Sequence, residues 1–140
     1  GIYGYTMAYR YTGDKKYLDQ AEATANFVMQ HPNLPDDGIP YWDFNDPAIP
    51  EAPRDASAAA IISSALFELY TFTDNEIYLK FASKVLSSLN SEAYLLSASV
   101  EGPFILDHST GNWPKNDEIN EPIVYGDYYF LEALLRQKDI

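Results

Sequence analysis

A helix–turn–helix pattern occurs twice in this chain. Six residues of the first stretch return with the same spacing in the second: Tyr9, Tyr11, Thr12, Tyr17, Leu18 and Ala21 correspond to Tyr70, Phe72, Thr73, Tyr78, Leu79 and Ala82. In each stretch, one helix is predicted to end, a tight turn to follow and a second helix to begin. Repeated helical hairpins are typical of solenoids and toroids, so the repeat favours an all-α fold.

Apolar residues at helical spacing predict five helices. We expect them over residues 2–11, 14–31, 56–73, 74–89 and 123–138. Asp55 is predicted to cap the third helix, and Thr73 and Glu76 to form a capping box at the start of the fourth. The first helix has no cap residue before it, so we expect it to begin upstream of Gly1.

The predicted helices alternate in character. The first, third and fifth are apolar on nearly every side, whereas the second and fourth have one apolar stripe and one polar face. In two concentric rings of helices, an inner helix contacts its neighbours and its outer partner, while an outer helix contacts only the layer beneath. The alternation therefore favours an arc of an α/α toroid, with residues 1–140 as a single partial domain.

The connections agree with this arrangement. The turns from inner to outer helices are short, but the links back, residues 32–55 and 91–122, are long and should lie at the same end. The first link contains six prolines and should have no regular element, while a short extended pair is possible at 94–96 and 104–106. Long links of this kind are usually functional, and helix N-termini at that end favour a ligand with a carboxylate.

Composition excludes several classes of protein. Nine Lys and Arg against 21 Asp and Glu give a net charge of −12, which argues against binding to nucleic acids or to an anionic membrane surface. Without cysteine, and with two histidines, we expect no disulfide, no metal and no cofactor. No apolar run approaches the roughly 20 residues of a membrane span and no signal peptide is recognisable, so localisation stays open. The 15% aromatic content adds carbohydrates to the candidate ligands.

Four residues in the long links are candidates for substrate binding. Trp42 and Trp113 could each stack on a sugar, although Trp42 could equally close its loop onto the inner helices. Arg54 could pair with a carboxylate or could brace the proline-rich link. His108 could bind a sugar or transfer a proton, or could hold its loop in place.

Other acidic residues have simpler interpretations. Asp43 and Asp46 are more typical of turns than of general acids. Asp127 and Glu132 lie on a predicted buried helix, where carboxylates need hydrogen-bond or ion-pair partners, so they are interpreted as structural.

Several blocks of the chain resemble the unsaturated glucuronyl hydrolases, glycoside hydrolase family 88. The resemblance covers the whole chain and is carried by residues 3–6, 11–14, 41–44, 53–60, 104–109 and 125–134. It implies an (α/α)6 barrel of twelve helices, of which this chain would be the C-terminal part. It also implies hydration of the C4–C5 double bond of an unsaturated uronic acid at the non-reducing end of oligosaccharides made by polysaccharide lyases.

The resemblance implies that the two catalytic aspartates lie in the N-terminal half of the family, outside this chain. We therefore expect no catalytic residue here and no activity of the chain alone. Two other interpretations stay open: an unsaturated rhamnogalacturonyl hydrolase, and a non-catalytic helical-repeat binding module. Because part of a toroid exposes inner-helix surface, we also expect the isolated chain to self-associate.

Overall fold

The structure, a computed structural model, describes residues 1–97 and 102–140. Five helices and one small hairpin are present in this part of the chain. They are α1 (Ile2–Thr12), α2 (Lys15–Met29), α3 (Ala56–Thr73), α4 (Glu76–Leu89), β1 (Ser109–Asn112), a 3₁₀ helix (Trp113–Lys115), β2 (Asp117–Glu121) and α5 (Val124–Lys138). The five helices predicted from periodicity are confirmed, with small shifts at their ends.

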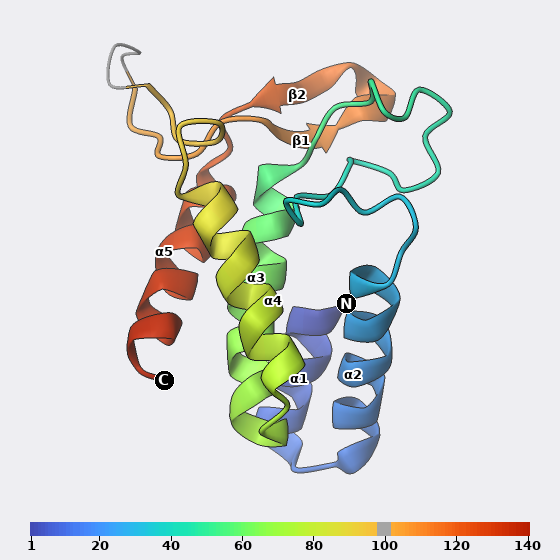
Figure 1. Ribbon diagram of the computed structural model, residues 1–140, viewed down its shortest axis with the longest axis vertical. Coiled ribbons are helices and arrows are strands. Elements are labelled where there is room, and N and C mark those ends of the chain that lie inside the picture. Colours follow the sequence, from blue (N-terminus) through green and yellow to red (C-terminus); the bar gives the residue numbers. More distant parts are fainter. Residues whose placement is uncertain (98–101) are drawn as a thin grey trace.

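The helices form two layers. α1, α3 and α5 run in the same direction and pack in that order, α2 returns along α1, and α4 returns along α3 and α5 (Figure 1). α3 is at the centre, with Leu66, Phe67 and Leu69 fully buried. It is long and apolar enough to cross a membrane, but 61% of it is buried inside the fold, as in the core helix of a soluble protein.

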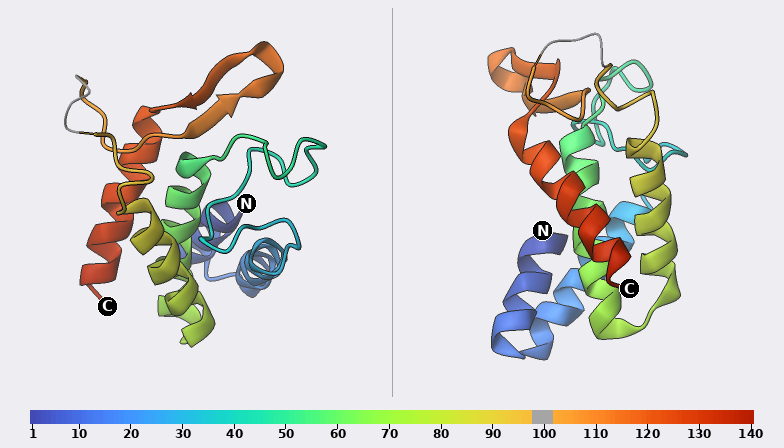
Figure 2. Two further views of the ribbon diagram at one scale, coloured as in Figure 1. Left: turned by 45° about the horizontal axis from the view of Figure 1, so that its top comes forward. Right: turned by 90° about the vertical axis from the view of Figure 1, so that its left-hand side faces the viewer.

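Burial on nearly every side was expected for all three inner helices, but only α3 approaches it, with 61% of the helix buried. Tyr11 on α1 is 78% exposed, and Val124 on α5 is 70% exposed. The reason is position, since α1 and α5 form the two edges of the layer. One side of each therefore has no neighbouring helix within the described residues (Figure 2).

The repeated turn has the same geometry in both copies. The hydroxyls of Thr12 and Thr73 each donate to the carbonyl four residues earlier, at 2.7 and 3.0 Å. The next residues, Gly13 and Asp74, are both left-handed, with φ of 66° and 54°. This conformation ends a helix and directs the chain into the following one.

The predicted capping box at the start of α4 is wrong. Thr73 is the last residue of α3, and Asn75 is the cap of α4, accepting from the amide of Ile77 at 3.1 Å. α3 continues to Thr73 because the left-handed residue that ends it is Asp74. The Thr73 hydroxyl therefore donates to the carbonyl of Leu69 in its own helix, and not to the start of α4. Glu76 instead accepts from the Tyr70 hydroxyl.

Both long links lie at the same end, where α3 and α5 begin (Figures 1 and 2). We call this end the loop end. The link of 32–55 has no regular element beyond one bridge between Tyr41 and Arg54, and a bridge between Leu95 and Leu106 matches the expected extended pair. Residues 98–101 of the second predicted link lie outside the described residues.

The hairpin of β1 and β2 was not predicted. Its antiparallel register pairs Ser109 with Glu121 and Asn112 with Asp117. β2 lacks the alternation of apolar and polar residues that identifies a strand, and its backbone has positive φ at Glu118 and Asn120. The hairpin extends over the loop end from the N-terminus of α5.

Candidate functional site

The two tryptophans meet at the loop end. Trp42 lies in the first link and Trp113 lies at the tip of the hairpin, and their rings stack with centroids 5.6 Å apart and planes 23° apart. The indole N–H of Trp42 donates to the carboxylate of Asp46, and Trp113 remains 40% exposed. Two residues predicted separately as sugar contacts therefore form one aromatic surface.

Arg54 is engaged within its own link. Its Nε donates to the carbonyl of Ile39 at 2.9 Å, its guanidinium pairs with Asp37, and it lies 5.1 Å from the centroid of the Tyr41 ring. These three contacts support the interpretation of Arg54 as a brace of the proline-rich link.

The partner of Arg54, Asp37, also joins the two links. Its Oδ2 accepts from the Tyr94 hydroxyl at 2.7 Å, and its backbone carbonyl accepts from the Ser88 hydroxyl of α4 at 2.8 Å. Burial, and then the hydrogen bond to Asp37, raise the pKa of Tyr94 well above its ordinary value. The phenol is therefore neutral and serves as a donor. The sequence offered no signal for this pair, because the two residues are far apart in the chain.

His108 joins the hairpin to the start of α3. Its Nδ1 is 2.7 Å from Oδ1 of Asn120, and its carbonyl accepts from the amide of Ala56 at 3.0 Å. Its backbone has a φ of 63°, and its ring meets the Tyr94 ring edge to face at 6.2 Å. The contacts support the loop-holding alternative, while the half-buried ring still lies at the loop end.

Asp55 is the cap of α3, as predicted. Its Oδ1 accepts from the amides of Ser57 at 3.1 Å and Ala58 at 3.3 Å. The same oxygen accepts from the amide of Thr110 on β1, whose hydroxyl donates to the carbonyl of Arg54 at 2.9 Å. The cap therefore also attaches the hairpin, a function that local spacing could not reveal.

Tyr125 at the start of α5 lies close to the hairpin and to α3, but it was not among the predicted site residues. Burial is the main cause that raises the pKa of its phenol; the hydrogen bond with Ser57 opposes this, and the charges of Asp55 and Glu118 add to it. Gly111 of β1 lies close to Tyr125: a Cβ atom at this position would be 3.1 Å from the Tyr125 hydroxyl and 2.5 Å from Oε2 of Glu118. Tyr125 belongs to a block that resembles the family, and that block was the available signal.

Asp127 has the structural role expected of it. Its carboxylate, in a residue only 7% exposed, accepts from the amides of Ile105 at 3.0 Å and Leu106 at 2.9 Å. α5 thereby holds the second link in place. Within residues 1–97 and 102–140, no group of three or more histidine, aspartate or glutamate side chains could hold a metal ion.

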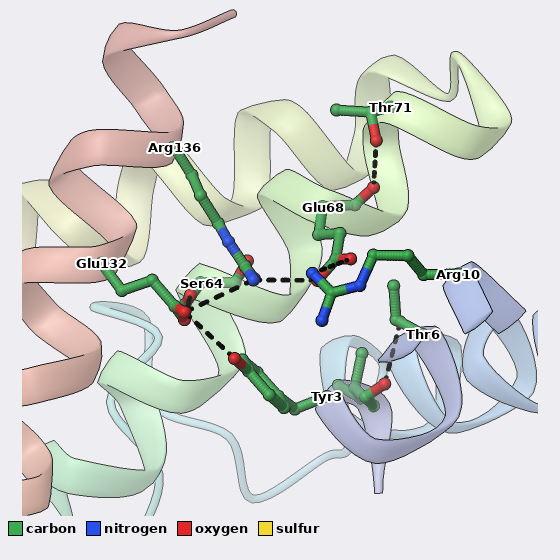
Figure 3. A network of polar contacts seen from close by, with 9 residues as sticks. Tyr3, Thr6, Arg10, Ser64, Glu68, Thr71, Glu132 and Arg136 are labelled. Carbon is green, nitrogen blue, oxygen red and sulfur yellow. Dashed lines mark hydrogen bonds and ion pairs between the residues drawn. The ribbon is translucent and has the colours of Figure 1, made fainter. Parts of the chain in front are cut away.

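A polar network joins the three inner helices (Figure 3). Buried Glu68 of α3 pairs with Arg10 of α1 at 3.0 Å and with Arg136 of α5 at 2.9 Å. Because a buried charge needs a partner, Glu68 depends on these two arginines for compensation.

Glu132 extends the same network. It accepts from the Tyr3 hydroxyl at 3.0 Å and from the Ser64 hydroxyl, and Arg136 lies 3.5 Å away. The structural interpretation of Glu132 agrees with these contacts. The network fixes how α1 and α5 lie on α3.

Comparison with known proteins identifies the family. The chain is 73% identical, over 99% of its length, to an unsaturated glucuronyl hydrolase from Formosa agariphila. The resemblance of the chain to the unsaturated glucuronyl hydrolases is therefore confirmed over its whole length. An unsaturated chondroitin disaccharide hydrolase from Streptococcus pneumoniae is 32% identical over 97% of the chain. The chain spans 35% of the length of each of these relatives. No family model matches it.

Solved structures of unsaturated glucuronyl hydrolases have the same fold. One, specific for heparin, has a TM-score of 0.95 and 47% identity, covering 99% of this chain and 38% of that one. A Streptococcus agalactiae mutant complexed with dGlcA-GalNAc6S has a TM-score of 0.87 and 30% identity, covering 99% of this chain and 38% of that one. The prediction of an arc of an α/α toroid is confirmed, because the chain has the same fold as the matching part of these structures.

Proposed function

We propose that this chain is part of a glycoside hydrolase that hydrates unsaturated uronic acid at the non-reducing end of oligosaccharides. The observation that carries the proposal is the 73% identity to the Formosa agariphila enzyme over 99% of the chain. The complex of a Streptococcus agalactiae relative with dGlcA-GalNAc6S adds support for a disaccharide of this class as substrate.

The reaction defines what the whole enzyme must supply. Hydration of the C4–C5 double bond needs an acid that protonates the vinyl ether and a base that activates water, and one carboxylic acid with a tuned pKa can do both. The hydrated product then opens and releases the next sugar. In this proposal, the acid comes from outside residues 1–140, as the family resemblance implies.

The chain contributes one wall of the substrate site at the loop end. Trp113 and Trp42 offer an aromatic face to a sugar ring, and His108 directly precedes β1 at the base of the hairpin that carries Trp113. Arg54 supports this wall through Asp37 and contributes to substrate binding by fixing the link that carries Trp42.

The test compares the chain alone with the complete polypeptide that its gene encodes. Each is incubated with an unsaturated glucuronyl–N-acetylgalactosamine disaccharide, and loss of the ultraviolet absorbance of the double bond is followed. We expect turnover by the complete polypeptide and none by residues 1–140. The proposal fails if the complete polypeptide does not act on this disaccharide, or acts only on an unsaturated rhamnogalacturonan disaccharide.

A further inference from the structure

Two aspartates in the link that carries Trp42 have the same local role. Oδ1 of Asp43 accepts from the amide of Asn45 at 2.8 Å, and Oδ1 of Asp46 accepts from the amide of Ala48 at 2.7 Å. Each contact closes a turn two residues long, which is the usual reason for aspartate in such a loop. The prediction that both are turn residues accounts for these two hydrogen bonds.

Asp46 differs from Asp43 in its second oxygen. Oδ2 of Asp46 accepts from the indole N–H of Trp42. The backbone of Trp42 is fixed separately, because its amide donates to the carbonyl of Pro53 at 3.0 Å. With the backbone held, the bond to Asp46 selects the rotation of the indole ring, since an indole has a single N–H to place.

The orientation of the Trp42 ring determines the support beneath Trp113. Trp113 begins a 3₁₀ helix at the tip of a largely exposed hairpin, between strands whose tip residues Asn112 and Asp117 are paired. Its ring contact within the described residues is the stack on Trp42 at 5.6 Å. One face of Trp113 is therefore covered by Trp42, while 40% of the residue remains exposed.

We propose that Asp46 is a positioning residue, which locks Trp42 and Trp113 into one platform for the sugar ring that follows the unsaturated uronate. The platform binds a pyranose through its C–H face, and Asp46 acts through Trp42 without touching the sugar. This inference rests on the proposed function for the identity of the sugar, but the Asp46–Trp42–Trp113 arrangement stands on the geometry alone.

The test uses Asp46→Asn with Asp43→Asn as its matched control. In either variant the amide oxygen can still accept from the turn amide, but at position 46 the remaining NH₂ group faces the indole N–H and cannot accept from it. A turn role alone predicts equal effects for the two variants. A positioning role predicts an effect for Asp46→Asn only.

The first readout is the circular dichroism of the stacked indoles. The chain contains two tryptophans, so coupling between indole transitions in residues 1–140 comes from this pair. We expect Asp46→Asn to diminish the coupled signal while the helical signal is unchanged, and Asp43→Asn to leave both as in the wild type. Equal signals in the two variants would overturn the positioning role.

The second readout is binding of the unsaturated glucuronyl–N-acetylgalactosamine disaccharide to the complete polypeptide, with Trp113→Ala as the variant that lacks the platform. We expect Trp113→Ala and Asp46→Asn to bind the disaccharide about tenfold more weakly than the wild type. Asp43→Asn should bind it with the affinity of the wild type. Unchanged binding in Asp46→Asn despite a lost indole signal overturns the platform but leaves turnover, and hence the proposed function, intact. Absence of turnover by the wild type counts against the proposed function, while the indole signal still tests Asp46.

Discussion

At the scale of single residues, the first link depends on a close approach to α4. Gly38 has a φ of 79°, and a side chain there would lie 2.8 Å from Cγ2 of Val85. Gly4, in the first turn of α1, has nothing within 4 Å of the same position. The two glycines therefore differ both in backbone conformation and in surrounding space.

Gly38→Ala should destabilise the protein by about 1–3 kcal/mol, because alanine resists the left-handed backbone and also meets Val85. Gly4→Ala should instead stabilise it by about 0.5–1 kcal/mol, since alanine is the better helix former. Urea unfolding of both variants measures the difference. Equal free energies of unfolding would show that the link is not packed against α4 as described.

Tyr94 gives a prediction about alkaline pH. Its pKa is raised in the folded protein by burial and by Asp37, so the unfolded chain loses this proton first, from about pH 10. Stability from this group is complete below that pH and falls as the pH rises above it.

We therefore expect the free energy of unfolding to decline less steeply above pH 10 in Tyr94→Phe than in the wild type. At neutral pH the variant should lose about 1 kcal/mol, because the hydrogen bond to Asp37 is gone. Urea unfolding from pH 7 to pH 11 tests this, with exposed Tyr11→Phe as the control. An equally steep decline of the free energy of unfolding above pH 10 in Tyr94→Phe and in the wild type would contradict it.

The candidate site could be predicted residue by residue but not as an assembly. Asp55 was recognised as a cap because capping depends on neighbours two and three positions away. The stack of Trp42 on Trp113, and the pair of Asp37 with Tyr94, join residues of different links. Such contacts depend on the fold, and no local pattern specifies them.

At the scale of helices and strands, periodicity was sufficient for α1 to α5, because each carries apolar residues at helical spacing. It was insufficient for β2, which is polar, and for the boundary between α3 and α4. There the left-handed Asp74 moved the cap from Thr73 to Asn75. Backbone conformations of single residues, which propensities describe poorly, decided both cases.

The cap of α3 has a second role that can be measured. Asp55→Ala should cost about 1–2 kcal/mol from the lost cap alone, and it should also release the hairpin through Thr110. Asn75→Ala, at the cap of α4, removes a cap without touching the hairpin.

Amide hydrogen exchange of both variants separates the two effects. Faster exchange in residues 109–121 is expected for Asp55→Ala only. The same increase in Asn75→Ala would mean that the hairpin responds to global stability rather than to Asp55.

At the scale of the whole molecule, the edges of the inner layer carry exposed apolar residues. On α5, four of them lie at helical spacing and are 47–70% exposed: Val124, Tyr128, Leu131 and Leu135. Exposed apolar stripes of this kind favour association.

We expect residues 1–140 in isolation to self-associate, and Leu131→Asp with Leu135→Asp to restore a monomer. Ile77→Asp on outer helix α4, where the side chain is 62% exposed, serves as the matched control and should leave association unchanged. Sedimentation over a range of concentrations measures the outcome. A wild-type chain that stays monomeric at high concentration would refute the expectation.

The network of Figure 3 also has a consequence for biosynthesis. Tyr3 and its acceptor Glu132 are 129 positions apart, and Arg136 reaches Glu68 from the same late helix. During translation, Arg10 and Glu68 leave the ribosome well before Arg136 does. Until Arg136 emerges, Glu68 can pair only with Arg10, so the contacts that join α5 to the network form after those that join α1 to α3.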